Sequence, residues 1–213
     1  MGEHTANARF ADEVSVEPDY ITRARAHALE LGAAPVSAAV GSQISVIAAA
    51  SNALNIVEIG TGAGVSGLWL MRGAPRATLT TIDSEPEHLS AARQAFIDAK
   101  IPPARARFIT GRASSVLPRM NEASYDVVLV DADPEAVIEY VEHGLRLVRP
   151  GGTVLVPRVL AGGGVSDPVR RDPTTVAYRS LIQETQASLA VIGALSIVGE
   201  GLLQLTTLRD YSS

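Results

Sequence analysis

The segment VEIGTGAGVSG, residues 57–67, limits the possible folds of this chain more than any other stretch. A strand-like run at 55–59 enters a glycine-dense turn, and a helix-like run at 65–72 leaves it. Glycine adopts backbone angles closed to other residues and lets a ligand approach the main chain. Free N–H groups at the start of the following helix attract a carboxylate or phosphate. We therefore expect a ligand-binding strand–turn–helix unit whose turn contains Gly60, Gly62 and Gly64.

Two acidic residues accompany this unit. Glu58 precedes the glycines, and Asp83 ends the next strand-like run, where nucleotide-binding units place the acid that binds ribose hydroxyls. Read from Gly62, the turn is the dinucleotide pattern G-x-G-x-x-G. Read from Glu58, it is E-x-G-x-G-x-G, the form associated with S-adenosylmethionine sites. A tight turn without any ligand is the third interpretation, so the turn alone does not identify the cofactor.

Strand and helix patterns alternate after the turn, which predicts a parallel sheet covered by helices on both faces. The run VVLV at 127–130 is apolar throughout, as a central strand buried on both faces should be. Two final strand-like runs, joined by Gly199-Glu200-Gly201, predict an antiparallel hairpin. The predicted fold class is α/β: a Rossmann-like, doubly wound, mostly parallel seven-stranded sheet ending in an antiparallel hairpin, with strands at 56–59, 79–82, 107–110, 126–130, 153–156, 190–198 and 202–208.

Helices are expected at 20–31, 36–50, 65–72, 86–100, 114–120, 134–147 and 174–188. Residues 1–18 are expected to form a flexible N-terminal arm, and residues 19–213 a single domain. The loop at 157–172 contains three consecutive glycines, Gly162 to Gly164. It is interpreted either as a flexible connection or as a lid over a pocket.

Composition excludes several classes of function. A net charge of −5 and an aromatic content of 4% argue against a nucleic-acid surface, which needs basic and stacking side chains. The absence of cysteine rules out disulfides, thiolate metal sites and a cysteine nucleophile. The first twenty residues lack the apolar core of a signal peptide, and the longest apolar stretch, about 189–198, is too short to span a membrane. We expect a cytoplasmic protein with no membrane partner.

From about residue 30 to 208 the chain resembles the class I methyltransferases. Their sheet also closes with an antiparallel hairpin, and LRLVRPGGTVLV and YDVVLVDAD resemble their fifth and fourth strands. More narrowly, the sequence resembles the small O-methyltransferases that include catechol and caffeoyl-CoA O-methyltransferases. That resemblance rests on PVS at 35–37, VEIGTGAGVS at 57–66, TIDSEPE at 81–87, GRASSVLP at 111–118, DAD at 131–133 and GEGLL at 199–203.

The resemblance implies an S-adenosylmethionine site. Val36 matches the family's main-chain contact to the methionine carboxylate, and Ser66 matches a hydroxyl contact to the same group. Glu58 and the glycine turn match the methionine-binding loop, and Asp83 matches the acid on the ribose. The implied cofactor-binding residues are Val36, Glu58, Gly60, Thr61, Gly62, Gly64, Ser66, Asp83, Ser84, Gly111, Arg112, Ala113, Asp131 and Asp133.

The chain departs from the family's usual metal site. Members usually hold a divalent metal with the acid of the fourth strand and an Asp-Asn pair after the fifth. Asp131 keeps the first position, but Pro157-Arg158 replaces the pair, and Pro134 replaces the family's lysine. Lys100, the only lysine, lies at the end of another helix, so no lysine base is expected. We predict no metal ligands and a metal dependence that is weakened or lost.

Asp131 and Arg158 are the predicted catalytic residues. Arg158 would place a fixed positive charge where the metal sits in the family, pair with Asp131 and stabilise a substrate oxyanion. Asp131 or Asp133 would remove a proton if burial raises its pKa. The alternative is that Arg158 makes only a structural salt bridge.

The predicted function is S-adenosylmethionine-dependent O-methylation of a small-molecule acceptor. Acids such as Asp131 and Asp133 suit a sulfonium cation better than an anionic dinucleotide. Two alternatives stay open: a catalytically degenerate S-adenosylmethionine-binding protein, and an NAD-dependent dehydrogenase using the G-x-G-x-x-G pattern. The resemblance also implies a homodimer.

Overall fold

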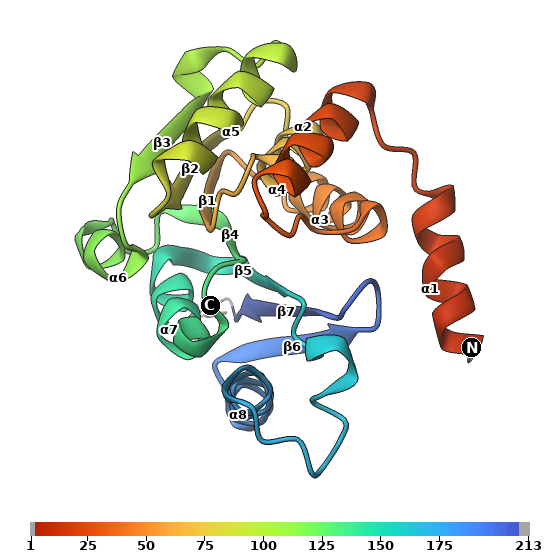
Figure 1. Cartoon of the computed structure of the whole chain (residues 1–213). Coiled ribbons are helices and arrows are strands. Elements are labelled where there is room, and N and C mark those ends of the chain that lie inside the picture. Colours follow the sequence, from red (N-terminus) through yellow and green to blue (C-terminus); the bar gives the residue numbers. More distant parts are fainter. Residues whose placement is uncertain (1–2, 209–213) are drawn as a thin grey trace.

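The computed structural model describes residues 3–208, with side chains from residue 6 onward. Within this range one seven-stranded sheet has the order β3-β2-β1-β4-β5-β7-β6 (Figure 1). The strands are β1 Asn55–Ile59, β2 Thr78–Asp83, β3 Ala106–Thr110, β4 Tyr125–Val130, β5 Val148–Pro157, β6 Val191–Ser196 and β7 Leu202–Thr207.

Strands β1 to β5 run parallel, and β7 pairs antiparallel with both β5 and β6. The chain builds the sheet outward from β1 through β2 to β3 and then crosses back to place β4 on the other side of β1. A ligand crevice forms at such a switch in strand order, outside the carboxyl ends of the strands. The predicted fold class, including the terminal hairpin, is confirmed.

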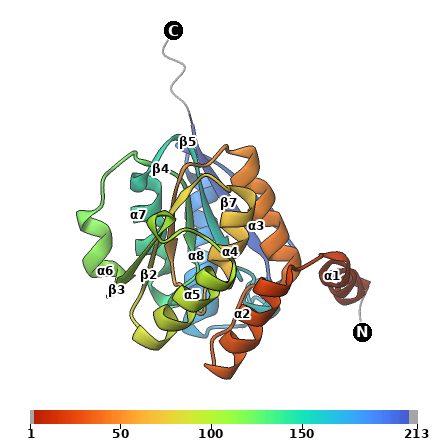
Figure 2. The ribbon, with the colours of Figure 1, turned by 90° about the horizontal axis from the view of Figure 1, so that it is seen from above.

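Helices cover both faces of the sheet (Figure 2). α2, α3, α4 and α5 lie on one face and α6, α7 and α8 on the other. The α-helices are α1 Glu3–Val14, α2 Asp19–Glu30, α3 Ala38–Ala50, α4 Val65–Gly73, α5 Pro86–Asp98, α6 Ala113–Val116, α7 Val137–Leu147 and α8 Pro173–Ala187, and the short 3-10 helices are η1 Pro103–Arg105, η2 Leu117–Arg119, η3 Pro134–Ala136 and η4 Ala161–Gly163.

The central strand β4 divides its side chains between two apolar clusters. Val127 and Leu129 pack with α2 to α5, whereas Val128 and Val130 pack with α6 to α8. Successive side chains of a strand point to opposite faces, so a strand covered on both sides is apolar at every position. This is the physical reason for the uninterrupted VVLV run.

Residues 3–14 of the predicted N-terminal arm form the helix α1, and the flexibility of the arm stays a prediction. α1 lies beside the main body (Figure 1) and is joined to α3 by Asp12, whose Oδ1 accepts a hydrogen bond from the main-chain N–H of Ala39 at 2.9 Å. The division of the chain at residue 18 stays a prediction. Two further predicted helices, 114–120 and 134–147, are each split into an α-helix and a short 3-10 helix.

The loop after β5 is held in place by α8. The Arg179 guanidinium donates hydrogen bonds to the main-chain oxygens of Gly164, Val165, Asp167 and Arg170. Asp172 begins α8 by accepting hydrogen bonds from the Thr175 main-chain N–H and hydroxyl. The loop therefore has a fixed path here, and its role as a lid stays a prediction. Across residues 3–208, no helix combines the length and the apolar character that crossing a membrane requires.

Candidate functional site

A cavity of about 580 Å³ opens at the carboxyl ends of the parallel strands. Its volume is in the range of small-molecule sites, about 300 to 1,000 Å³. The residues that follow β1, β2, β3, β4 and β5 all contribute to it. The predicted residues that line it are Gly60, Thr61, Gly62, Ser66, Asp83, Ser84, Gly111, Arg112, Ala113, Asp131, Asp133 and Arg158.

The glycine turn lies against the end of β4. Gly60 has a φ of +92°, and a Cβ atom built on it would lie 2.0 Å from the main-chain oxygen of Asp131. Only glycine allows this approach and this backbone angle together. The turn leads into α4, and the first two residues of this helix, Val65 and Ser66, line the cavity. N–H groups of a first helical turn lack intrahelical partners and favour an anionic ligand group there.

Asp83 joins the glycine turn to the end of β2. Its Oδ2 accepts hydrogen bonds from the main-chain N–H groups of Thr61 at 3.0 Å and Gly62 at 2.9 Å, and its Oδ1 accepts one from Glu85 at 2.9 Å. A carboxylate offers about four acceptor positions, so about one is left for a ligand hydroxyl. Its side chain is 10% exposed and borders the cavity. Asp83 is thus placed at the cavity with an acceptor position left over, and its ribose-binding role stays a prediction.

His88 is a cavity residue that the sequence reasoning missed. It lies in the first turn of α5, with Nδ1 3.6 Å from Oδ1 of Asp83. Tyr140 of α7 also lines the cavity. The signal that could have found His88 is its position five residues after the strand-end acid, in the first turn of the helix that begins at the same edge of the sheet.

Glu58, by contrast, does not line the cavity. It is fully buried, and its two carboxylate oxygens accept hydrogen bonds from the hydroxyls of Ser66 at 2.6 Å and Thr81 at 2.7 Å. Burial raises the pKa of Glu58 to about 7; the two hydroxyl bonds oppose this shift, and the charges of Asp131 and Asp83 add to it. Glu58 thus ties β1, β2 and α4 together beneath the turn.

Val36 and Gly64 also lie outside the cavity lining. Val36 is buried, and its carbonyl accepts a hydrogen bond from Nη1 of Arg25 at 2.6 Å. Gly64, with a φ of +88°, packs against Ala92 and Phe96 at the start of α4. Their neighbours Pro35 and Ala63 do line the cavity. The predicted cofactor contacts of Glu58, Val36 and Gly64 stay predictions.

Asp131 and Arg158 meet at the wall of the cavity, as predicted from the sequence. Nη2 of Arg158 donates to Oδ1 of Asp131, and Nη1 donates to the main-chain oxygen of Ala34. Burial raises the pKa of Asp131, and the Arg158 charge and hydrogen bond oppose that shift. Arg158 has a left-handed φ of +61°, which costs a non-glycine residue roughly 1 kcal/mol or more.

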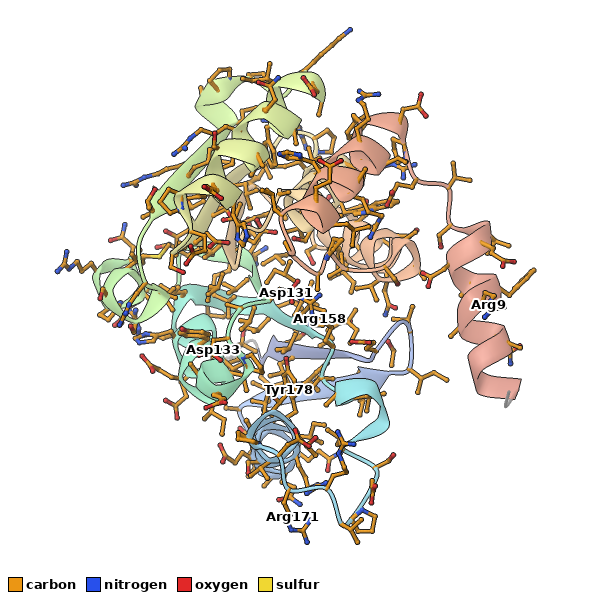
Figure 3. All side chains as sticks on the ribbon, viewed as in Figure 1. Arg9, Asp131, Asp133, Arg158, Arg171 and Tyr178 are labelled. Atoms are coloured by element: carbon orange, nitrogen blue, oxygen red, sulfur yellow. The ribbon has the colours of Figure 1, made fainter. Side chains whose placement is uncertain are left out.

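Tyr178 of α8 reaches toward this ion pair (Figure 3). The residue is 7% exposed, and it interacts electrostatically with Asp131, Arg158, Glu200 and Asp133. Burial, with the Asp131 charge adding to it, raises the pKa of Tyr178 to about 12. The phenol is therefore a hydrogen-bond donor near neutral pH. The sequence reasoning did not select it, because a tyrosine on a helix carries no pattern of its own.

The residues around Asp131 do not fit the family's divalent metal. Oxygen-rich sites need several carboxylate or carbonyl ligands, whereas Pro157 and Arg158 replace two of the expected ligands. The Arg158 guanidinium contacts the carboxylate that would bind the ion. Among residues 3–208, no group of three or more His, Cys, Asp or Glu side chains is placed to hold a metal.

Comparison with known proteins identifies the family. The O-methyltransferase family model matches residues 13–205. A protein of Mycobacteroides abscessus named "Putative O-methyltransferase" is 45% identical over 202 residues, which cover 94% of each chain. A second similar protein is the O-methyltransferase TomG from Streptomyces achromogenes, which is involved in tomaymycin synthesis and was crystallised in complex with SAM (S-adenosylmethionine). Its structure has a TM-score of 0.85 at 26% identity, and the match covers 98% of this chain and 100% of TomG. An O-methyltransferase from Bacillus cereus in complex with SAH (S-adenosylhomocysteine) has a TM-score of 0.84 at 25% identity, covering 95% of this chain and 97% of that one.

This chain belongs to the O-methyltransferase family. The prediction of an S-adenosylmethionine-dependent O-methyltransferase is confirmed at the level of the family. The individual site residues and the metal requirement stay predictions.

Proposed function

We propose that this chain transfers a methyl group from S-adenosylmethionine to an oxygen atom of a small-molecule acceptor, with Arg158 in place of a metal. The observation that carries the proposal is the Arg158 guanidinium, which pairs with Asp131 at the wall of the cavity. The matched fold of SAM- and SAH-bound relatives supports the cofactor.

The cofactor supplies a methyl group already activated on a sulfonium, so the protein mainly has to position the acceptor and exclude water. Asp83 and the glycine turn would hold the ribose, and the N-terminus of α4 would bind the carboxylate of the cofactor. Arg158 supplies positive charge to the acceptor oxygen, a role that fixed donors perform without reorganisation. Asp131 orients Arg158 through their ion pair.

The test is calorimetric titration of the whole chain with S-adenosylhomocysteine, first with magnesium and then with a chelator. We expect the same affinity in both, because Arg158 and Pro157 stand where metal ligands would be. Arg158→Ala is expected to lower methyl transfer to phenols and aromatic carboxylates by about 100-fold, the usual loss for a removed oxyanion donor. The affinity for S-adenosylhomocysteine should change by less than about threefold.

Arg149→Ala is the matched control, since Arg149 forms an ion pair with Asp126 at the opposite edge of the sheet. It should leave turnover unchanged. Magnesium-dependent binding would overturn the metal-free assignment. Tight binding without turnover of any acceptor would instead support the catalytically degenerate alternative, which the replaced lysine and metal residues keep open.

We also propose that the protein is cytoplasmic and forms a homodimer. Apolar residues exposed on β6 support the dimer. Ile192 is 65% exposed and Leu195 is 40% exposed. We expect sedimentation equilibrium to give twice the chain mass of 22.3 kDa, and Ile192→Lys to give the monomer mass. Ile97→Lys, on the exposed side of α5, is the control and should stay dimeric. A monomeric wild-type chain would refute the dimer.

A further inference from the structure

A chain of four hydrogen-bonded side chains runs beneath the glycine turn and meets the cavity at both of its ends. The hydroxyl of Ser66 donates to Oε1 of Glu58 at 2.6 Å, and the hydroxyl of Thr81 donates to Oε2 at 2.7 Å. The hydroxyl oxygens of Thr61 and Thr81 lie 2.6 Å apart, which is hydrogen-bonding distance. All four residues are at least nine-tenths buried, and of the four the two end residues, Ser66 and Thr61, line the cavity.

The protonation state of Glu58 decides whether this chain has a hydrogen to offer to a ligand. Each hydroxyl has one hydrogen to donate, and an ionised carboxylate has none. With Glu58 ionised, three hydroxyls supply three hydrogens, and the three hydrogen bonds of the chain use all of them. With Glu58 protonated, four hydrogens serve the same three bonds, so one is left over. The two inner groups are fully buried, so this hydrogen can reach a ligand only on Ser66 or Thr61.

Ser66 is the end of the chain at which an anionic ligand group is expected. It is the second residue of α4, and the first turn of a helix offers N–H groups that lack intrahelical partners. The anionic group of S-adenosylmethionine is its carboxylate. A carboxylate only accepts hydrogen bonds, so it gains nothing from a Ser66 hydroxyl whose hydrogen is turned to Glu58. Protonation of Glu58 frees that hydrogen and also removes a negative charge beneath the turn.

The surroundings of Glu58 allow it to gain or lose a proton near neutral pH. Burial raises its pKa to about 7, against the effect of the two hydroxyl hydrogen bonds. The charges of Asp131, which follows β4, and Asp83, which ends β2, raise the pKa further. Both of these neighbouring charges are negative, so they favour the neutral form of the carboxyl group.

We infer that the cofactor binds to the form of the protein in which Glu58 is protonated, and that Glu58 acts through Ser66 as a positioning residue. This inference rests on the proposed function. The Glu58 carboxyl group donates to Oγ of Ser66, and the Ser66 hydroxyl donates to the carboxylate of the cofactor. Where Glu58 is ionised in the free protein, binding therefore takes up one proton from the solvent, and this proton stays on the Glu58 carboxylate.

The test is calorimetric titration of the whole chain with S-adenosylhomocysteine at pH 6 and pH 8, each in two buffers with different enthalpies of ionisation. The difference between the two buffers gives the number of protons taken up. We expect binding to be about 10-fold weaker at pH 8 than at pH 6, because each pH unit above the pKa of the free protein costs up to about tenfold. Proton uptake should approach one per site at pH 8 and be small at pH 6. Affinity that rises with pH would instead show that ionised Glu58 attracts the ammonium group of the ligand, and would overturn the inference.

Glu58→Gln keeps the shape of the side chain and supplies an N–H donor to Ser66 at every pH. This variant should bind S-adenosylhomocysteine at pH 8 within threefold of the wild type at pH 6, without proton uptake. Ser66→Ala should bind more weakly at pH 6 and change less than twofold between the two pH values. Thr61→Val is the matched control, because it removes the hydroxyl at the other end of the chain and keeps the main-chain N–H that binds Asp83. It should retain the 10-fold change, and loss of that change in Thr61→Val but not in Ser66→Ala would refute the role of Ser66.

His88 provides a second control, since histidine also changes charge near neutral pH and His88 lines the cavity. His88→Gln should keep both the 10-fold change and the proton uptake; loss of both would assign the proton to His88 and overturn the inference. Binding that is independent of pH and takes up no proton would also overturn the inference and leave the proposed function standing. Failure of S-adenosylhomocysteine to bind at either pH would refute the proposed function, and the inference with it.

Discussion

Asp83→Asn is expected to weaken the binding of S-adenosylhomocysteine by about 100-fold, the largest change in cofactor affinity that any single site residue should produce. The Asp83 carboxylate accepts hydrogen bonds from Thr61, Gly62 and Glu85 and borders the cavity. An amide loses the charge and turns one acceptor into a donor that faces other N–H groups. Loss of a charge-assisted hydrogen bond costs about 1.5 to 3 kcal/mol, and the distorted turn adds to it. Calorimetry on the whole chain measures the change.

Asp126→Asn is the control for Asp83, because it alters an equivalent carboxylate at the other edge of the sheet. Asp126 also accepts two main-chain hydrogen bonds, from Leu54 at 2.7 Å and Asn55 at 2.8 Å. Burial acts to raise its pKa, but the hydrogen bonds from Arg149 and from these N–H groups lower the pKa below its ordinary value. Asp126→Asn should lower the stability of the fold but leave the cofactor affinity unchanged. If Asp83→Asn binds S-adenosylhomocysteine within threefold of the wild type, the ribose assignment is wrong.

Glu58→Gln is expected to change how stability depends on pH more than any other exchange in the core. The folded state holds the Glu58 proton up to a pKa of about 7, above its ordinary value of 4.5. The folded chain therefore binds more protons than the unfolded chain between these values, and the free energy of unfolding falls as pH rises through this window. For this fully buried group the full loss is ~3 kcal/mol, of which about 2 to 3 kcal/mol falls between pH 5 and pH 8.

Glu58→Gln removes the titrating group and keeps its shape, with one oxygen acceptor for the hydroxyls of Ser66 and Thr81. Urea unfolding of the cofactor-free chain at pH 5 and pH 8 measures the effect. The wild type should lose about 2 to 3 kcal/mol more than the variant between the two values. Glu142→Gln, on an exposed position of α7, should behave as the wild type. Identical pH dependence of Glu58→Gln and the wild type would show that Glu58 is ionised in the folded chain throughout.

Individual elements show which structural features could be predicted from the sequence. The glycine turn, the acid at the end of β2 and the terminal hairpin could all be predicted, because turn residues and apolar periodicity report local backbone conformation and burial. The α1 helix could not, since its residues have no strong apolar face, and its contact with α3 depends on Asp12 meeting the N–H of Ala39. Glu58 illustrates the limit within a motif: its position before the glycines was readable, but its side chain turns to Ser66 and Thr81 rather than into the cavity.

The sequence by itself determined the fold class, the family and the edge of the sheet at which the site forms, because parallel strands bring their carboxyl ends to one edge. It also indicated that Arg158 would replace a metal ligand. The sequence also predicted the pairing of Arg158 with Asp131. Only the tertiary structure decided that the Arg158 side chain also donates to the carbonyl of Ala34, 124 residues away in the chain, and that Tyr178 lies nearby. Such contacts join segments remote in sequence. They depend on how the helices pack over the strand ends, and no local pattern of residues records that packing.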